Sequence, residues 1–187
     1  MNSPIANLFL SLQTQIAALA DGASNTYFKF VEQDLGQLED HSGDNRPPVM
    51  WPCALIDIDG LDTKDLGQNA QEGVLSVCIR VGFPPFSASS AATPLEYRQK
   101  AIYFYDLEQL LHKALQGANP GDISGYTALQ DVFGPYTRIS ARTERRNDKI
   151  RVRELRYTIG IDDYSTQTQN VHVPAALNLN ANLNLTP

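Results

Sequence analysis

The sequence GPYTRISARTERRNDKIRVRELRYTIGIDD, residues 134–163, has the pattern of a long β-hairpin. Residues 146–149, Arg-Asn-Asp-Lys, lie where a tight turn is needed, because Asn and Asp tolerate positive φ and bond their own backbone. The two arms are then Tyr136–Glu144 and Ile150–Ile161. The stretch therefore predicts two paired antiparallel strands around which the rest of the chain is arranged.

The second arm changes the face on which its apolar residues lie. Ile150 and Val152 share one parity, whereas the apolar residues from Leu155 to Ile161 share the other. A period-2 strand changes faces when a residue is inserted, so the pattern predicts a β-bulge near residues 153–154. The outer part of the hairpin carries charges on both faces. We therefore expect it to project from the body, with only Leu155 onward in the main sheet.

The hairpin is also strongly basic. It holds eight of the chain's fifteen Lys and Arg residues, although the net charge of the whole chain is −6: Arg138, Arg142, Arg145, Arg146, Lys149, Arg151, Arg153 and Arg156. Three acidic residues accompany them, namely Glu144, Asp148 and Glu154. The plainest interpretation is a solvated hairpin in which Arg and Glu pair across the strands. The functional interpretation is an electrostatic contact surface.

Two partners suit such a surface, a nucleic acid or the acidic face of another subunit. Few aromatic residues are available between Arg138 and Arg156 to stack on bases, which disfavours recognition of single strands. The charge separation favours protein association, because a head-to-tail ring brings a basic part against a neighbour's acidic part. The predicted assembly contacts are Arg138, Arg142, Arg145, Arg146, Lys149, Arg151 and Arg153.

Two helices are predicted outside the hairpin. Ser3 and Pro4 begin the first as cap and first helical residue, and an apolar stripe runs to a stop at residues 21–22, Asp-Gly. Residues 93–96, Thr-Pro-Leu-Glu, form a capping box that begins a second helix of about 23 residues, ending near Leu115 before Gly117.

Three further strands are predicted at residues 27–31, 49–58 and 72–83. Pro52 removes a ladder donor, so the second strand is an edge or begins its regular pairing after the proline. Residues 57–71 have the composition of an acidic, glycine-containing loop. The expected fold class is α+β, with a mainly antiparallel sheet, two packed helices and a projecting charged β-hairpin. Residues 1–163 form one domain in this interpretation.

Residues 164–187 differ from the rest of the chain. From Ser165 onward they contain no Asp, Glu, Lys or Arg, and they end in the alternating sequence AALNLNANLNLTP. Alternation is typical of a strand, although Asn is a poor strand former. Two interpretations follow, an arm that orders by pairing with another chain's edge and a disordered tail.

No pattern in the sequence predicts an enzyme, a cofactor or a metal centre. Residues 57–65 fail the EF-hand spacing, because glycine comes at position 4 and leucine at position 5. The three histidines, His41, His112 and His172, lack zinc-ligand spacing, and Cys53 and Cys78 are expected to be inert strand thiols. We also expect neither a secretory signal nor a membrane helix, and a cytoplasmic location.

The order of elements resembles the tail-terminator and tail-completion (neck) proteins of long-tailed phages. The resemblance covers residues 3–163 and includes Pro52-Cys-Ala-Leu-Ile-Asp57, the alternating strand, the long helix and the charged hairpin ending in Arg156-Tyr-Thr-Ile-Gly-Ile161. It implies a non-catalytic α+β protein that assembles into a homo-oligomeric, hexameric ring on a tail tube, formed in the host cytoplasm and then part of the virion. The alternative is a nucleic-acid-associated module that uses residues 138–156.

Overall fold

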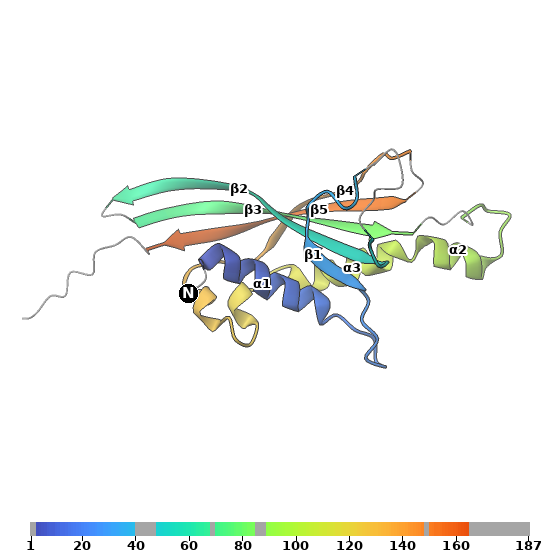
Figure 1. Cartoon of the computed structure of the whole chain (residues 1–187), viewed down its shortest axis with the longest axis horizontal. Helices are drawn as coiled ribbons and strands as arrows, with labels where there is room; N and C mark the ends of the chain where they lie inside the picture. Colours follow the sequence, from blue (N-terminus) through green and yellow to red (C-terminus); the bar gives the residue numbers. More distant parts are fainter. Residues whose placement is uncertain (1–2, 40–47, 68–69, 85–88, 148–149, 165–187) are drawn as a thin grey trace, which may run out of the picture.

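The computed structural model describes residues 3–39, 48–67, 70–84, 89–147 and 150–164. The described residues form a five-stranded sheet in the order β1-β2-β3-β5-β4, with α1 and α3 packed on one face (Figure 1). The strands are β1 (Phe30–Gln33), β2 (Cys53–Gly67), β3 (Ala70–Phe83), β4 (Thr137–Thr143) and β5 (Arg151–Asp163), and the α-helices are α1 (Pro4–Ala17), α2 (Leu95–Ile102) and α3 (Phe104–Leu115). Only β1 and β2 pair in parallel. The predicted α+β class with a mainly antiparallel sheet is confirmed.

The first helix begins as predicted. The Ser3 hydroxyl accepts a hydrogen bond from the Ala6 amide at 3.1 Å, and Pro4 is the first helical residue. Leu8, Leu12 and Ile16 are fully buried against the sheet. The helix ends at Ala17, four residues before the predicted stop, because the chain turns there into a short bridge between Ala20 and Thr26.

The predicted long helix is two helices, which meet at Tyr103. The prediction of a Thr93 cap is wrong, because Pro94 precedes the first turn of α2 and no side chain caps it. The two helices differ in burial: α2 buries Ala101, whereas α3 buries an apolar face that packs on the sheet. The break at Tyr103 therefore separates a mostly exposed helix from one that packs on the sheet. The predicted terminator is confirmed, since Gly117 has a φ of +79°.

The described residues of the predicted loop at 57–71 are strand: 57–67 belong to β2 and 70–71 to β3. β2 pairs with β3 from Cys53↔Gly82 to Gly67↔Ala70, with a register shift between Ile58 and Gly60. β3 offers a paired backbone along the whole stretch, and this tertiary pairing outweighs the turn-like composition. Pairing of β2 does begin after Pro52, as predicted. β1 lies three residues later than the predicted strand at 27–31.

The predicted bulge near residues 153–154 is wrong. β5 pairs with β3 without a register shift from Arg151↔Phe83 to Asp163↔Gln71. The main sheet therefore includes β5 from Arg151, not only from Leu155 as predicted. The parity change has another cause, a second core on the opposite face of the sheet. Its buried members are Leu38, Cys53, Leu55 and Val152. The register shift of the hairpin lies instead in β4, between Arg138 and Ser140.

An ion cluster around Arg80 adjoins this second core. The guanidinium of Arg80 donates to Glu144 at 2.7 Å, to Glu39 at 2.8 Å and to Asp34 at 3.1 Å. It therefore joins the central strand β3 to the segment after β1 and to the residues that follow β4. The Arg80 side chain is only 12% exposed.

The cluster shifts the pKa values of Arg80 and Glu144. Burial disfavours the charged guanidinium, but the hydrogen bonds to Glu144 and Asp34 outweigh this effect and raise the pKa of Arg80. Burial alone would raise the pKa of Glu144, but the hydrogen bonds from Arg80 outweigh it and lower that pKa. Each group is thus held in its charged form by the other.

The second core predicts the cost of removing Leu55. We expect Leu55→Ala to lower the free energy of unfolding by about 3 kcal/mol, because it opens a cavity beside Val152. Leu66→Ala is the matched control, since Leu66 is 49% exposed, and should cost less than about 0.5 kcal/mol. Urea unfolding measures both variants. Equal, small effects would show that residues 38, 53, 55 and 152 form no core.

The Arg80 cluster predicts a stability that depends on pH. A carboxyl whose pKa is lowered by folding stabilises the protein above the ordinary value of 4.5, and that stability is lost as the pH falls through the lowered value. We expect Glu144→Gln to cost about 2 kcal/mol near neutral pH. The difference from wild type should shrink steadily below the ordinary value. Urea unfolding of both proteins across this pH range measures the difference, with exposed Glu96→Gln as control. A difference in unfolding free energy that stayed constant with pH would contradict the prediction.

Candidate assembly surface

The structure divides the predicted cationic contacts into two groups, and three of them are held within the chain. Arg153 donates to Glu108 of α3 at 2.6 Å and to Thr143 at 2.7 Å, and Arg138 lies 3.7 Å from the same Glu108. Arg146 pairs with Glu144 at 3.1 Å, and its side chain is 7% exposed. Arg138 and Arg153 thus fix the hairpin to α3, and little of the charge of these three arginines faces solvent.

Three others lie at the surface. Arg142 is 64% exposed in spite of a 3.4 Å contact with Glu154, and Arg145 is exposed as well. Arg151 is exposed, and its guanidinium lies 4.2 Å from the centre of the Phe104 ring. This cation–π contact holds the charge at one place without neutralising it. Lys149 lies outside the described residues.

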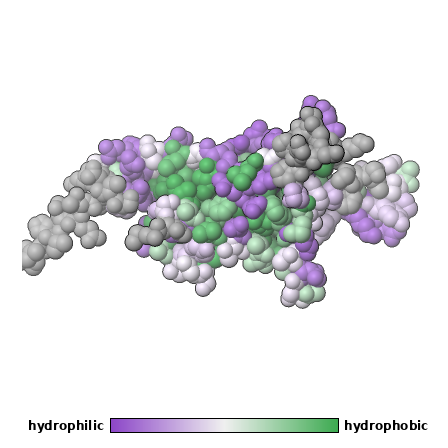
Figure 2. All heavy atoms as spheres, in the orientation of Figure 1, coloured by the Kyte–Doolittle hydropathy of each residue, from purple (hydrophilic) through white to green (hydrophobic). Residues whose placement is uncertain are grey.

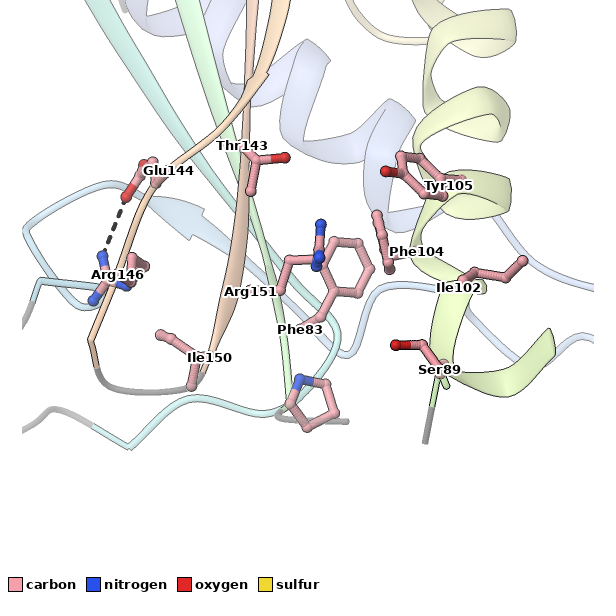
Figure 3. A pocket seen from close by; sticks show the side chains of 12 residues that line it. Phe83, Ser89, Ile102, Phe104, Tyr105, Thr143, Glu144, Arg146, Ile150 and Arg151 are labelled. Atoms are coloured by element: carbon pink, nitrogen blue, oxygen red, sulfur yellow. Dashed lines mark hydrogen bonds and ion pairs between the residues drawn. The ribbon is translucent and has the colours of Figure 1, made fainter. Parts of the chain in front are cut away.

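A hollow of about 400 Å³ separates the hairpin from the helices at this end of the molecule. Figure 3 shows Glu144, Arg146 and Ile150 on one side of it, Ile102 and Tyr105 on the other, and Arg151 beside Phe104 between them. The half-exposed side chains of Ile102 and Tyr105 add apolar surface next to exposed charge. This combination is typical of a protein contact surface.

The opposite end of the sheet is acidic. β2 carries Asp59, Asp62 and Asp65 at exposed positions, and neighbouring β3 and β5 add Glu72 and Asp162. Lys64 is the only Lys or Arg on β2, and Asp59 is paired across the sheet with Arg156. Asp162 lies eleven residues along β5 from Arg151, a separation of about 36 Å. The basic and acidic surfaces therefore lie at the two ends of one long sheet (Figure 1).

Sequence reasoning found the cationic cluster but missed its partners. Glu108 lies 45 residues from Arg153 on the buried side of α3, where helical spacing gave no reason to single it out. Residues 57–71 are predicted as a loop, and this prediction does not place their carboxylates at the end of the sheet. The available signal is Arg80, the one charged residue in the alternating segment 75–81.

The described residues give no sign of a metal centre. No group of three or more His, Cys, Asp or Glu side chains among them could hold an ion. Of the three histidines, only His112 is described; it lies on α3, and burial lowers its pKa. Burial raises the pKa of Cys53 to about 12 and of Cys78 to about 11, and both are free thiols. No described helix is long and apolar enough to span a membrane.

Comparison with known proteins adds one structural likeness. No family model matches the chain, and no curated protein matches its sequence. Among solved structures, a chain of the "Virion of native gene transfer agent (GTA) particle" is similar, with a TM-score of 0.46 and 14% sequence identity. The match covers 87% of this chain and 100% of that chain.

Proposed function

We propose that the protein is a non-catalytic structural component of a phage-like particle, which assembles head to tail into a ring. The observation that carries the proposal is the placement of exposed cations and exposed carboxylates at opposite ends of one rigid sheet. A two-fold dimer pairs opposite charges only if the two sheets lie antiparallel side by side, whereas an end-to-end contact in a two-fold dimer would bring like charges together. A head-to-tail contact pairs opposite charges at every interface.

Arg142, Arg145 and Arg151 are the contacts that face solvent, and Lys149 extends the same predicted set. In this proposal Arg138, Arg146 and Arg153 position the hairpin through their internal ion pairs rather than touch a neighbour. The acceptor is the acidic end formed by Asp62, Asp65 and Glu72 with Asp162. Such rim charges set the rate and specificity of association more than its strength. Apolar Ile102 and Tyr105 supply area to bury.

The order of elements supports a tail-terminator or tail-completion role within the particle. Residues 1–163 would form the ring body, with residues 164–187 as an arm or tail. The partners in this proposal are further copies of the chain, six in the layout it resembles, and a tail-tube or neck protein. Assembly would take place in the host cytoplasm before the ring enters the particle.

The internal ion pairs count against the nucleic-acid alternative. Half of the predicted cations are held by carboxylates of the same chain, namely Arg138, Arg146 and Arg153 among the six described. Few cations are then left to contact phosphates, and because each contact adds to the affinity, so few contacts give weak binding. A mobility-shift assay at low salt tests this directly, because no shift removes the alternative.

Charge reversal at the two ends gives a decisive test. The double variant Arg142→Glu/Arg145→Glu places acid against acid, and Asp62→Arg/Asp65→Arg places base against base, so each alone should weaken association by at least about tenfold. An equal mixture of the two variants should assemble again, because copies of the two variants that alternate pair opposite charges at every interface. Native mass spectrometry and light scattering at low salt measure the species, and Lys113→Glu on α3 is the matched control.

Two outcomes would contradict the ring. One is a strict monomer at high concentration and low salt, both alone and with a tail-tube protein. The other is full assembly of either reversed variant alone. Electron microscopy then distinguishes a closed ring from the open filament that an unclosed head-to-tail contact would produce.

A further inference from the structure

β2 has an open edge over most of its length. β1 pairs with it only at Cys53–Ile56, and the Asp34 amide adds one more bond to the Ile56 carbonyl. From Asp57 to Gly67 the described chain pairs with β2 on the β3 side alone. An exposed edge of this length is a ready template for another strand.

An apolar groove lies beside this edge. Its walls are Ile5, Phe9 and Leu10 of α1 and Ile58 and Leu61 of β2, and its volume is about 720 Å³. It begins next to Gln33, where β1 ends, so it continues the line of β1 along β2. Figure 2 shows hydrophobic surface over the β2–β3 part of the sheet, with hydrophilic surface at its outer end. A strand placed here would cover Ile5 and Leu61, which are 36% and 43% exposed.

From Ile58 to Lys64 the two faces of the open edge differ in polarity. The register shift after Ile58 makes Asp59 an extra residue, so that Ile58 and Leu61 lie on the same face, toward α1. Thr63 follows Leu61 on that face, opposite Gly73. Asp62 and Lys64 lie on the other face. A matching strand needs apolar side chains at alternate positions and uncharged polar ones between them.

Residues 175–185 have this pattern. Ala and Leu occupy the odd positions from 175 to 185, and four of the five even positions are Asn. The segment has eleven residues, the same number as 57–67, and carries no Asp or Glu to repel the aspartates of β2. We propose that residues 175–185 add to the open edge of β2 in the same chain as an antiparallel strand. Their Leu side chains then fill the α1 groove and their Asn side chains meet Asp62 and Lys64.

The connection is long enough for this path. β5 ends at Asp163, which is paired through Gln71 with Asp65 near the end of β2. The new strand would lie three strand spacings from β5, about 14 Å away. Residues 164–174 reach about 35 Å when extended. A chain that turns back at this end runs antiparallel to β2, and the short connection makes pairing within one chain favourable. The inference does not depend on the proposed ring.

Disulfide trapping in the full chain tests the pairing. Thr63→Cys is combined in turn with Cys at 177, 179, 181 and 183 on the Leu face, and with Cys at 178, 180 and 182 on the Asn face. We expect odd positions near 179 to form a disulfide within one chain and even positions to form none, because bonded strand neighbours share a face. Cys53 and Cys78 are buried with raised pKa values and should not compete. The Thr63→Cys single variant checks this.

Hydrogen exchange gives a second readout that needs no cross-link. Leu179→Asn/Leu183→Asn should speed exchange of the 57–67 amides by about tenfold, whereas Asn178→Gln/Asn182→Gln should leave it unchanged. Both changes lie outside the described core, so the fold is not at risk. Equal exchange in all three proteins, disulfides of both parities, or disulfides only between chains would each overturn the proposal.

Discussion

The unbroken pairing of β3 with β5 is the constraint on which the rest of the structure depends. It runs from Phe83↔Arg151 to Gln71↔Asp163, while β2 pairs with the other side of β3 along nearly the same length. Because these three long strands pair over most of their length, the sheet is stiff enough to separate its ends by about 36 Å. The same pairing draws the outer, charged part of the hairpin into the sheet. Arg138 and Arg153 then meet Glu108 of α3, whereas Arg142, Arg145 and Arg151 stay at the surface.

The second core explains why the apolar residues of β5 change faces and why the sequence wrongly predicted a bulge there. Val152 and Leu155 have opposite parity because each faces a buried cluster on its own side of the sheet. Alternation shows which residues share a face, but it does not show how many faces are covered. The residues that cover the second face include Leu38, more than one hundred positions from Val152 in the sequence. Such a contact leaves no local pattern, so a bulge was the only local explanation.

Local chemistry predicted the elements whose ends depend on a few neighbouring residues. Ser3 caps α1, Gly117 ends the segment after α3, and Pro52 delays the pairing of β2, all as expected. Prediction from local sequence failed where pairing with a distant strand decides the secondary structure. Residues 57–67 have turn-like composition and yet are strand, because β3 supplies a partner throughout. The basic cluster was visible in the sequence, but its division into paired and exposed arginines depends largely on Glu108 of α3, which the fold brings to it.

This division matters for association more than the total charge does. Arginines already bonded to Glu108 or Glu144 would lose those bonds on contacting a neighbour, so they favour no new interface. Arg151, held against Phe104, keeps its charge and a fixed position, and therefore loses little conformational entropy on binding. The exposed carboxylates at the other end are placed by strands paired on at least one side. Both charged surfaces are thus preorganised by the sheet that separates them. In the proposed ring, a weak, salt-sensitive contact repeated in each copy would become strong only when the assembly closes.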